Sequence, residues 1–154
     1  MDSDIQDGRT SSGEDWLYSD IVKEHFFNPK NFSTATPIGY NAMGMVGSPA
    51  CGDMMKVWLK INVRTEKIED FKWQTFGCAS AIASTSALSE IVLENGGKTV
   101  DEALTITPQD IMVRLGGLPQ IKIHCSVLGD QALEAAVNVY FKKTGQEERV
   151  KSNK

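Results

Sequence analysis

The stretch MKVWLKINVRTEKIEDFKWQTF (Met55–Phe76) decides the fold of this chain. From Met55 to Val63, apolar residues alternate with lysine, tryptophan and asparagine, which is the two-residue period of a half-buried strand. A second strand from Ile68 to Phe76 follows a short polar loop. It gathers Phe71, Trp73 and Thr75 on one face. The stretch therefore predicts an antiparallel hairpin.

The residues before the hairpin predict a helix and then an edge strand. A helix from Trp16 to Asn28 is indicated by a stripe at helical spacing, made of Tyr18, Ile21, Val22, His25 and Phe26. Pro29 ends this pattern. The Gly-rich segment from Pro37 to Ala50 predicts an edge strand followed by a loop.

The residues after the hairpin predict helices. An Ala/Ser-rich helix opens at Cys78 and ends at Gly96–Gly97, and Thr99 and Thr107 each begin a short capped helix. The last helix runs from about Ser126 to Lys143, and its buried stripe consists of Leu133, Ala136, Val137, Tyr140 and Phe141. We predict an α+β fold in which helices cover one face of a small antiparallel sheet of about three strands.

Length and composition indicate a single folded unit. The chain has 154 residues, of which 41% are hydrophobic, enough for one core. Residues 1–15 are acidic and poor in large aliphatic side chains, so we expect a disordered tail. The predicted domain covers residues 16–145, and residues 146–154 form a charged C-terminal tail.

Charge and hydropathy exclude two classes of partner. The net charge of −4 offers no broad basic surface for a phosphate backbone, so we expect no nucleic acid partner. No apolar stretch is long enough to span a membrane, and the first residues do not resemble a leader. We expect a cytoplasmic protein, or one of the mitochondrial matrix if it is a processed eukaryotic chain.

The three cysteines all lie where predicted elements begin. Cys51 precedes the first hairpin strand, Cys78 follows the second, and Cys125 precedes the last helix. The start of a helix favours the thiolate and lowers a thiol pKa, and the thiolate is the form that binds metal. Taken one at a time, each cysteine is equally well explained as a buried small side chain. Their shared position at junctions favours function.

Further candidate ligands stand beside these cysteines. Asp53 follows Cys51 by two residues, and His124 directly precedes Cys125. A two-iron, two-sulfide cluster needs four protein ligands, so Cys51, Cys78 and Cys125 would be completed by Asp53 or His124. A mixed ligand set with a carboxylate holds a cluster less firmly than four thiolates, which suits a donor. Which of the two completes the set stays open.

Other chemistry is weakly indicated. Common hydrolase, metalloprotease and nucleotide-binding motifs are missing, so we do not expect an enzyme. His25 lies on the apolar face of the first helix and is better explained as a packed histidine with a hydrogen bond.

Three motifs together resemble the IscU/NifU-type iron-sulfur cluster assembly scaffolds. They are GSPACGD (47–53), TFGCASAIAS (75–84) and LGGLPQIKIHCS (115–126), and residues 18–31 also look like the first helix and turn of that family. The resemblance covers roughly residues 16–145 and implies an IscU/SufE-like fold of the free-standing type.

The resemblance also implies a function. By this resemblance, we expect the chain to receive persulfide sulfur from a cysteine desulfurase, take up iron, build a [2Fe-2S] cluster and pass it to apoproteins such as a ferredoxin. Cys51, Cys78, Cys125, Asp53 and His124 match the ligand positions of the family. We expect Cys125 to be the first persulfide acceptor.

Two features of the resemblance leave alternatives. The family segment recognised by an Hsp70-type chaperone system reads Leu118, Pro119, Gln120, Ile121 and Lys122 here. Gln120 replaces a proline, which puts the chaperone interaction in doubt. The same ligands could hold zinc in the apo form or in a zinc-dependent sulfur acceptor, which is the alternative function. Homo-oligomerisation stays open.

Overall fold

The computed structural model describes residues 20–48, 53–116 and 123–150. Its three strands are β2 (Ala42–Ser48), β3 (Asp53–Ile61) and β4 (Ile68–Phe76), and they form one antiparallel sheet in the order β2-β3-β4. The predicted hairpin and edge strand are confirmed. β3 begins two residues before the predicted Met55, so Asp53 is a strand residue.

The alternation along β3 divides the sheet into two faces. Val57 lies opposite Trp73, and Leu59 lies opposite Phe71; all four side chains are buried on the same face. Met55, Val57, Leu59 and Ile61 keep the period of two that the sequence shows. Asp53 has the same parity and therefore faces the core side of the sheet.

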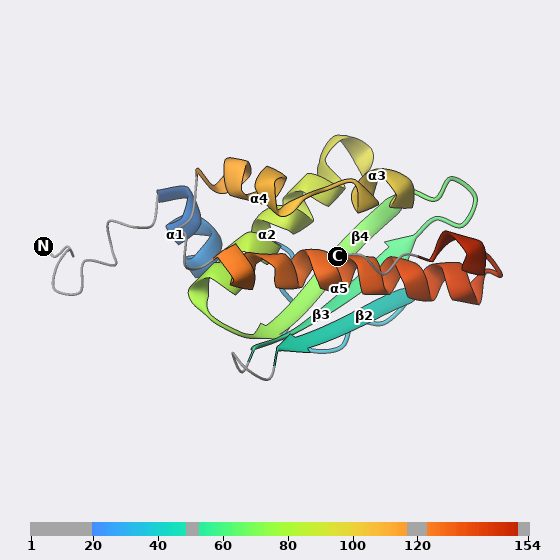
Figure 1. The fold of residues 1–154 in the computed structure, drawn as a ribbon, viewed down its shortest axis with the longest axis horizontal. Helices are drawn as coiled ribbons and strands as arrows, with labels where there is room; N and C mark the ends of the chain where they lie inside the picture. Colours follow the sequence, from blue (N-terminus) through green and yellow to red (C-terminus); the bar gives the residue numbers. More distant parts are fainter. Residues whose placement is uncertain (1–19, 49–52, 117–122, 151–154) are drawn as a thin grey trace, which may run out of the picture.

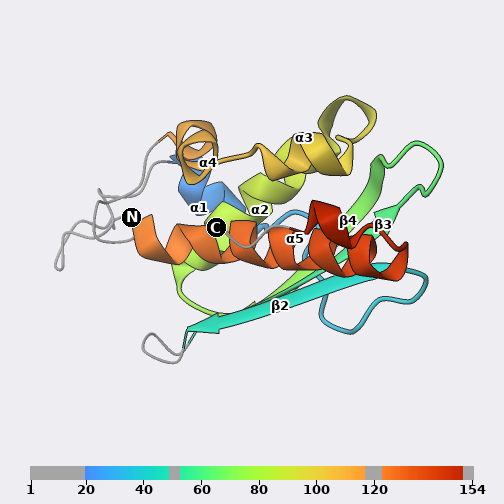
Figure 2. The ribbon, with the colours of Figure 1, turned by 45° about the vertical axis from the view of Figure 1, so that its right-hand side comes forward.

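The helices of the described residues all lie on the core side of the sheet (Figures 1 and 2). Their bounds are α1 (Asp20–Phe27), α2 (Ala79–Leu93), α3 (Val100–Leu104), α4 (Pro108–Leu115) and α5 (Ile123–Lys143), with short 3-10 turns at Glu94–Gly96 and Glu147–Arg149. α5 packs on β2 and β3, and α2 packs on β4. The predicted α+β architecture is confirmed.

α2 is the central helix and is buried along almost its whole length. Its side chains are mostly alanine and serine, whose small size lets neighbouring backbones approach closely. At Gly129 of α5, an added Cβ would lie 2.5 Å from Thr85 Oγ1 of α2. The small residues of both helices therefore set the distance at which α2 and α5 pack.

The short helices end and begin as predicted. Thr99 and Thr107 each form a complete capping box with the acid three residues later, and Gly116 ends α4 in the left-handed conformation. α5 begins at Ile123, three residues before the predicted start. Cys125 therefore lies inside the first turn of α5 rather than before it.

The predicted apolar face of the first helix is partly wrong. α1 packs on α2 through Val22 and His25, which are buried, whereas Ile21 is 47% exposed. A helix that contacts a single neighbour buries a narrow strip, so the wider stripe read from the sequence does not all become core. Trp16 and Tyr18 lie outside the described residues.

Candidate metal centre

Several elements that carry candidate ligands begin at the same end of the molecule. In Figures 1 and 2, β3, α2 and α5 all start at the left end, where β4 finishes. Asp53 is the first residue of β3, Cys78 is the N-cap of α2, and Cys125 is the third residue of α5. The fold thus brings together backbone positions that lie up to 72 residues apart in the sequence.

Asp53 is the clearest sign of a binding site at this end. Its side chain is on the core face of the sheet, and the residue is only 9% exposed. Its Oδ2 atom is buried and accepts no hydrogen bond from any described residue. A buried polar atom without a partner costs about 1–3 kcal/mol, and a bound cation would remove that cost.

Gly77 leaves room beside this carboxylate. A Cβ at Gly77 would stand 3.5 Å from Asp53 Cγ, 3.1 Å from Thr75 Oγ1 and 3.2 Å from the Cβ of Ala81. The carboxyl group of Asp53 therefore lies next to the backbone that leads into Cys78. A larger residue at position 77 would fill the space between the two candidate ligands.

Cys78 is held at the start of α2. It has extended backbone angles at the N-cap, is partly buried, and packs against the core. Its Sγ lies 3.1 Å from the Oγ of Ser80, which is fully buried. When the sulfur is deprotonated only the hydroxyl can donate, so Ser80 stabilises the thiolate form together with the helix N-terminus.

The contact between α2 and α5 limits how far Cys125 lies from Cys78. Thr85 touches Gly129, seven residues after Cys78 and four after Cys125. At 1.5 Å per helical residue, Cys78 lies about 10 Å from this contact along α2, and Cys125 lies about 6 Å from it along α5. Both helices start at the same end of the molecule (Figure 1), so the backbones of both cysteines lie at the end where β3 begins with Asp53.

Part of the predicted site lies outside the described residues. This holds for Cys51, for the segment Leu118–Lys122, and for the side chains of His124 and Cys125. The part of the chain that the structure describes holds no group of three or more His, Cys, Asp or Glu side chains that could bind a metal. Asp53 and Cys78 are the predicted ligands whose side chains are placed.

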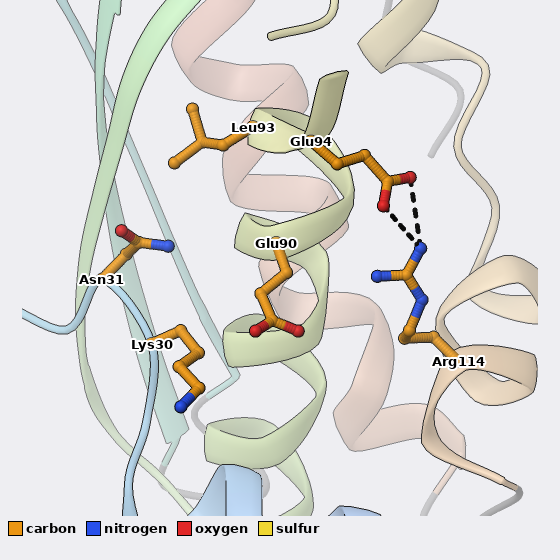
Figure 3. A pocket seen from close by; sticks show the side chains of 6 residues that line it. All are labelled: Lys30, Asn31, Glu90, Leu93, Glu94 and Arg114. Carbon is orange, nitrogen blue, oxygen red and sulfur yellow. Dashed lines mark hydrogen bonds and ion pairs between the residues drawn. The ribbon is translucent and has the colours of Figure 1, made fainter. Parts of the chain in front are cut away.

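A separate groove lies near the other end of α2 (Figure 3). It has a volume of about 570 Å³ and is lined by Lys30, Asn31, Glu90, Leu93, Glu94 and Arg114. Arg114 Nη2 donates to both carboxylate oxygens of Glu94, at 2.9 and 3.1 Å. None of the predicted ligands lines it. Of its charged side chains, Arg114 pairs with Glu94, while Lys30 and Glu90 pair with Glu24 and His25 outside the groove.

His25 is a structural residue, as predicted. Its Nδ1 lies 2.7 Å from the Oγ of Ser86, and its Nε2 lies 3.5 Å from a carboxylate oxygen of Glu90. Burial of the ring lowers the pKa of His25, although the Glu90 carboxylate acts in the opposite direction. It joins α1 to α2 and has no place in the metal centre.

The sequence interpretation missed Ser80 and the spacing role of Gly77. A serine two residues after a cysteine at a helix start is in the first turn, where its hydroxyl can reach back to the sulfur. That spacing was the available signal for Ser80. The closeness of Gly77 to Asp53 had no such signal, because Asp53 lies 24 residues earlier, on β3.

Comparison with known proteins identifies similar chains. The family model described as the NifU-like N terminal domain matches residues 17–147. The iron-sulfur cluster assembly scaffold protein IscU 1 of Archaeoglobus fulgidus is 44% identical over 135 residues, which cover 88% of this chain and 84% of that protein. The nitrogen fixation protein NifU of Nostoc sp. is 49% identical over 129 residues, covering 81% of this chain but 42% of that protein.

A solved structure agrees with these sequence matches. The N-terminal part of a nitrogen-fixing NifU-like protein from Brucella abortus superposes with a TM-score of 0.50 at 25% identity, covering 88% of this chain and 96% of that one. This chain spans less than half of the length of the Nostoc protein.

Among the described helices, none is long and apolar enough to cross a membrane.

Proposed function

The chain belongs to the family of NifU-like N-terminal domains, and we propose that it is a scaffold on which an iron-sulfur cluster is assembled and then transferred to apoproteins. The observation that carries this proposal is the buried carboxylate oxygen of Asp53, which has no described partner, in a carboxyl group that lies beside Gly77, the residue before Cys78. A carboxylate and a cysteine at the end of the molecule where three elements begin offer donor atoms that iron binds.

The donor set accounts for a cluster that is held and then released. Cys51, Cys78 and Cys125 would supply thiolates, and Asp53 or His124 would supply the fourth ligand. A carboxylate oxygen binds iron in sulfide clusters less firmly than thiolate does, so it exchanges more readily with the ligands of an acceptor. We propose a [2Fe-2S] cluster as the cargo, with zinc able to occupy the same ligands in the apo form.

Sulfur would arrive as a persulfide on Cys125. The thiolate of Cys125 attacks the terminal sulfur of a persulfide on a cysteine desulfurase, the S–S bond of the donor breaks, and the donor leaves as a thiolate. The position of Cys125 in the first turn of α5 supports this role, because backbone N–H groups there favour a thiolate. In this scheme the chain acts as an acceptor rather than as an enzyme.

The partners that follow from this function are a cysteine desulfurase and apoproteins such as an apo-ferredoxin. A chaperone of the Hsp70 and J type stays a prediction, because the segment Leu118–Lys122 differs from the family motif at Gln120 and lies outside the described residues. A location in the cytoplasm, or in the mitochondrial matrix for a processed chain, also stays a prediction.

Anaerobic reconstitution tests the proposal directly. The protein is incubated with iron, cysteine and a cysteine desulfurase, and iron, sulfide and zinc are counted alongside the visible absorption spectrum. We expect equal iron and sulfide and a two-iron spectrum that is lost when apo-ferredoxin is added. Stoichiometric zinc with persulfide and no sulfide would instead support a zinc-dependent sulfur acceptor.

Replacing Asp53 tests the proposed labile ligand. We expect Asp53→Ala to lengthen the lifetime of the bound cluster in the presence of a chelator by about tenfold, which is about 1.4 kcal/mol in activation free energy. The physical reason is the loss of an exchangeable oxygen and of its access to iron. The lifetime is followed by visible absorbance after adding the chelator.

Asp70→Ala is the matched control, because Asp70 accepts a hydrogen bond from Tyr40 at the other end of the sheet. It should leave the cluster lifetime unchanged. If the cluster decays equally fast in Asp53→Ala and in the unaltered protein, Asp53 does not have the role given to it here.

Replacing Cys125 tests the route of sulfur. We expect Cys125→Ser to accept no persulfide from the desulfurase, because a hydroxyl cannot attack the terminal sulfur at neutral pH. Mass spectrometry of the non-reduced protein detects the mass of one added sulfur atom. Binding to the desulfurase, measured by gel filtration, should be retained, and full sulfur loading of the variant would move the acceptor role to Cys51 or Cys78.

A further inference from the structure

The face of the sheet turned away from the helices carries large apolar side chains. On the edge strand β2, Met43 is 42% exposed and Met45 is 54% exposed, and at the end of β4 Phe76 is 68% exposed. Figures 1 and 2 show that no described helix lies on this side. The segment between α1 and β2 covers part of it, because Ser33 accepts a hydrogen bond from Gln74 and Tyr40 donates one to Asp70. We call it the open face and define it by Met43, Met45, Phe76, Lys56, Lys60 and Lys72.

The strand register places these residues on one face of the sheet. Met45 lies opposite Lys56, while Met43 and Lys72 flank Trp58 on its two sides. Directly paired side chains on one face of an antiparallel sheet lie about 4.5–5.5 Å apart between their Cβ atoms. Trp58 is only 5% exposed, so the centre of the open face is already packed and its apolar rim is available.

An exposed apolar rim of this kind favours a protein partner. Fully burying a side chain such as Met or Phe contributes about 1.5–3 kcal/mol relative to leaving it exposed. Contiguous apolar surface on a folded domain often marks an interaction site. The rim begins at the metal centre, because Phe76 pairs with Met54, the neighbour of Asp53, and precedes Cys78 by two residues.

The charges of the open face indicate the character of the partner. Lys56, Lys60 and Lys72 point to this side, and none forms an ion pair with another described residue, although the whole chain has a net charge of −4. Among the described strand residues, the acid Asp70 has the same orientation and lies opposite Lys60, whereas Lys56 and Lys72 have no acid directly opposite them. The open face is therefore locally basic on an acidic protein.

The same charges argue against a second copy of this chain. A symmetric dimer through the open face would place lysines of one copy near lysines of the other, which is unfavourable. A partner with carboxylates around an apolar centre would match both features.

We propose that the open face is the docking surface for an acidic acceptor apoprotein, which it positions beside the metal centre. The proposal rests on the scaffold function proposed above. Electrostatic attraction to the three lysines would raise the rate of encounter, and Met45 and Phe76 would slow dissociation.

A charge-reversal pair tests the docking surface. The variant Lys56→Glu/Lys72→Glu is compared with Lys23→Glu/Lys142→Glu, which makes the same change in net charge at exposed positions on α1 and α5. The probe is the apo form of a [2Fe-2S] ferredoxin chosen for its acidic surface, and the rate of cluster transfer is measured at low and high ionic strength. We expect the open-face variant to transfer its cluster about tenfold more slowly than the unaltered protein at low ionic strength. The transfer rate of this variant should depend little on ionic strength.

A second variant tests the apolar rim. Met45→Ser should reduce the affinity for the same apo-ferredoxin and leave the salt dependence unchanged, because it removes apolar contact without altering charge. Titration calorimetry with the cluster-free protein measures binding alone. It separates a failure of docking from a failure of cluster assembly, which would show as absent iron and sulfide in every variant.

Specific outcomes would overturn the docking proposal. Transfer by Lys56→Glu/Lys72→Glu at the unaltered rate and with the unaltered salt dependence is one. An equal loss of rate in the Lys23→Glu/Lys142→Glu control is another, because it would reflect net charge alone. Removal of the acidic residues 1–19 could also raise the affinity for apo-ferredoxin. If this gain equals the loss caused by charge reversal, residues 1–19 are the occupant of the open face. A dimer that dissociates in Met45→Ser would make a second copy the occupant.

Discussion

At the scale of single residues, the proposed metal centre combines two side chains in opposite situations. The buried oxygen of Asp53 has no described partner, whereas the sulfur of Cys78 lies 3.1 Å from the hydroxyl of Ser80. An unpartnered carboxylate is ready to bind a cation and destabilises the protein without one. A thiolate that accepts a hydrogen bond is stabilised before any metal arrives. Without a bound metal, the buried oxygen of Asp53 therefore lowers the stability of the fold, whereas the contact with Ser80 stabilises the thiolate of Cys78.

Ser80 should control the reactivity of Cys78. We expect Ser80→Ala to slow alkylation of Cys78 by iodoacetamide at neutral pH about tenfold, because a hydrogen bond to a charged group contributes roughly 1.5 kcal/mol. Peptide mass spectrometry resolves Cys78 from the other cysteines. Ser84→Ala is the control, since Ser84 is equally buried but donates to the carbonyl of Ala81. Equal rates in both variants would show that Ser80 only packs.

At the scale of elements, the contact between β2 and α5 shapes the fold. A Cβ at Gly44 would meet two backbone atoms of α5, the carbonyl oxygen of Ala132 and the nitrogen of Ala136. The helix backbone therefore rests directly on the strand. This close contact fixes the position of α5 and, through it, the position of Cys125 at the start of the helix.

Gly44 should accept no side chain. We expect Gly44→Ala to lower the free energy of unfolding by about 2–3 kcal/mol, because the methyl group must push α5 off the sheet. Urea unfolding of the apo protein measures the change. Gly47→Ala in the same strand is the control and should stay within about 0.5 kcal/mol, since the nearest atom to its Cβ is 3.7 Å away. Similar losses in both variants would point to strand propensity rather than to contact with α5.

At the scale of the whole molecule, acid-sensitive contacts join elements that are distant in sequence. His25 links α1 to α2, and Arg149 from the turn after α5 binds Glu66 in the hairpin loop at 3.0 Å and Asp101 of α3 at 2.8 Å. Arg149 also lies over the ring of Phe141, 4.3 Å from its centre. These contacts hold α1 against α2, and they join the turn after α5 to the hairpin loop and to α3.

Stability should fall in two steps as the pH is lowered. Burial, with Lys30 and Arg114 nearby, lowers the pKa of His25 below its ordinary value of 6.5, while Glu90 and Glu24 raise it. The hydrogen bond from Arg149 is the largest cause that lowers the pKa of Glu66 below 4.5. In both cases the folded state binds the proton more weakly than the unfolded state. Each group therefore contributes its full share to the free energy of unfolding above its ordinary pKa. This contribution is lost as the pH falls through the pKa that the group has in the folded protein.

Urea unfolding at a series of pH values measures these steps. His25→Asn should remove the first step, below pH 6.5, and Glu66→Gln should remove the second, below pH 4.5. If the first step survives in His25→Asn, His25 is not the group that causes it.

Much of the fold was predictable from local patterns. The alternation in Met55–Phe76 predicts the hairpin, and the Thr99 and Thr107 capping boxes predict the short helices, because each signal depends on neighbours within a few residues. Ends of elements were less predictable. β3 begins two residues before its expected start because Asp53 and Met54 pair with Ser48 and Gly47 of β2, and α5 begins three residues before its expected start.

For the proposed metal centre too, some features were predictable from the sequence and others were not. The sequence by itself determined that Cys78 and Cys125 stand at helix starts, and it predicts which residues would bind iron, because residue chemistry and helix signals are local properties. Only the tertiary structure decided that the starts of β3, α2 and α5 share one end, that an oxygen of Asp53 is buried without a described partner, and that the opposite face of the sheet is apolar and basic. Those features depend on contacts such as Gly44 with Ala132 and Thr85 with Gly129, which join residues 88 and 44 positions apart and leave no periodic trace in the sequence.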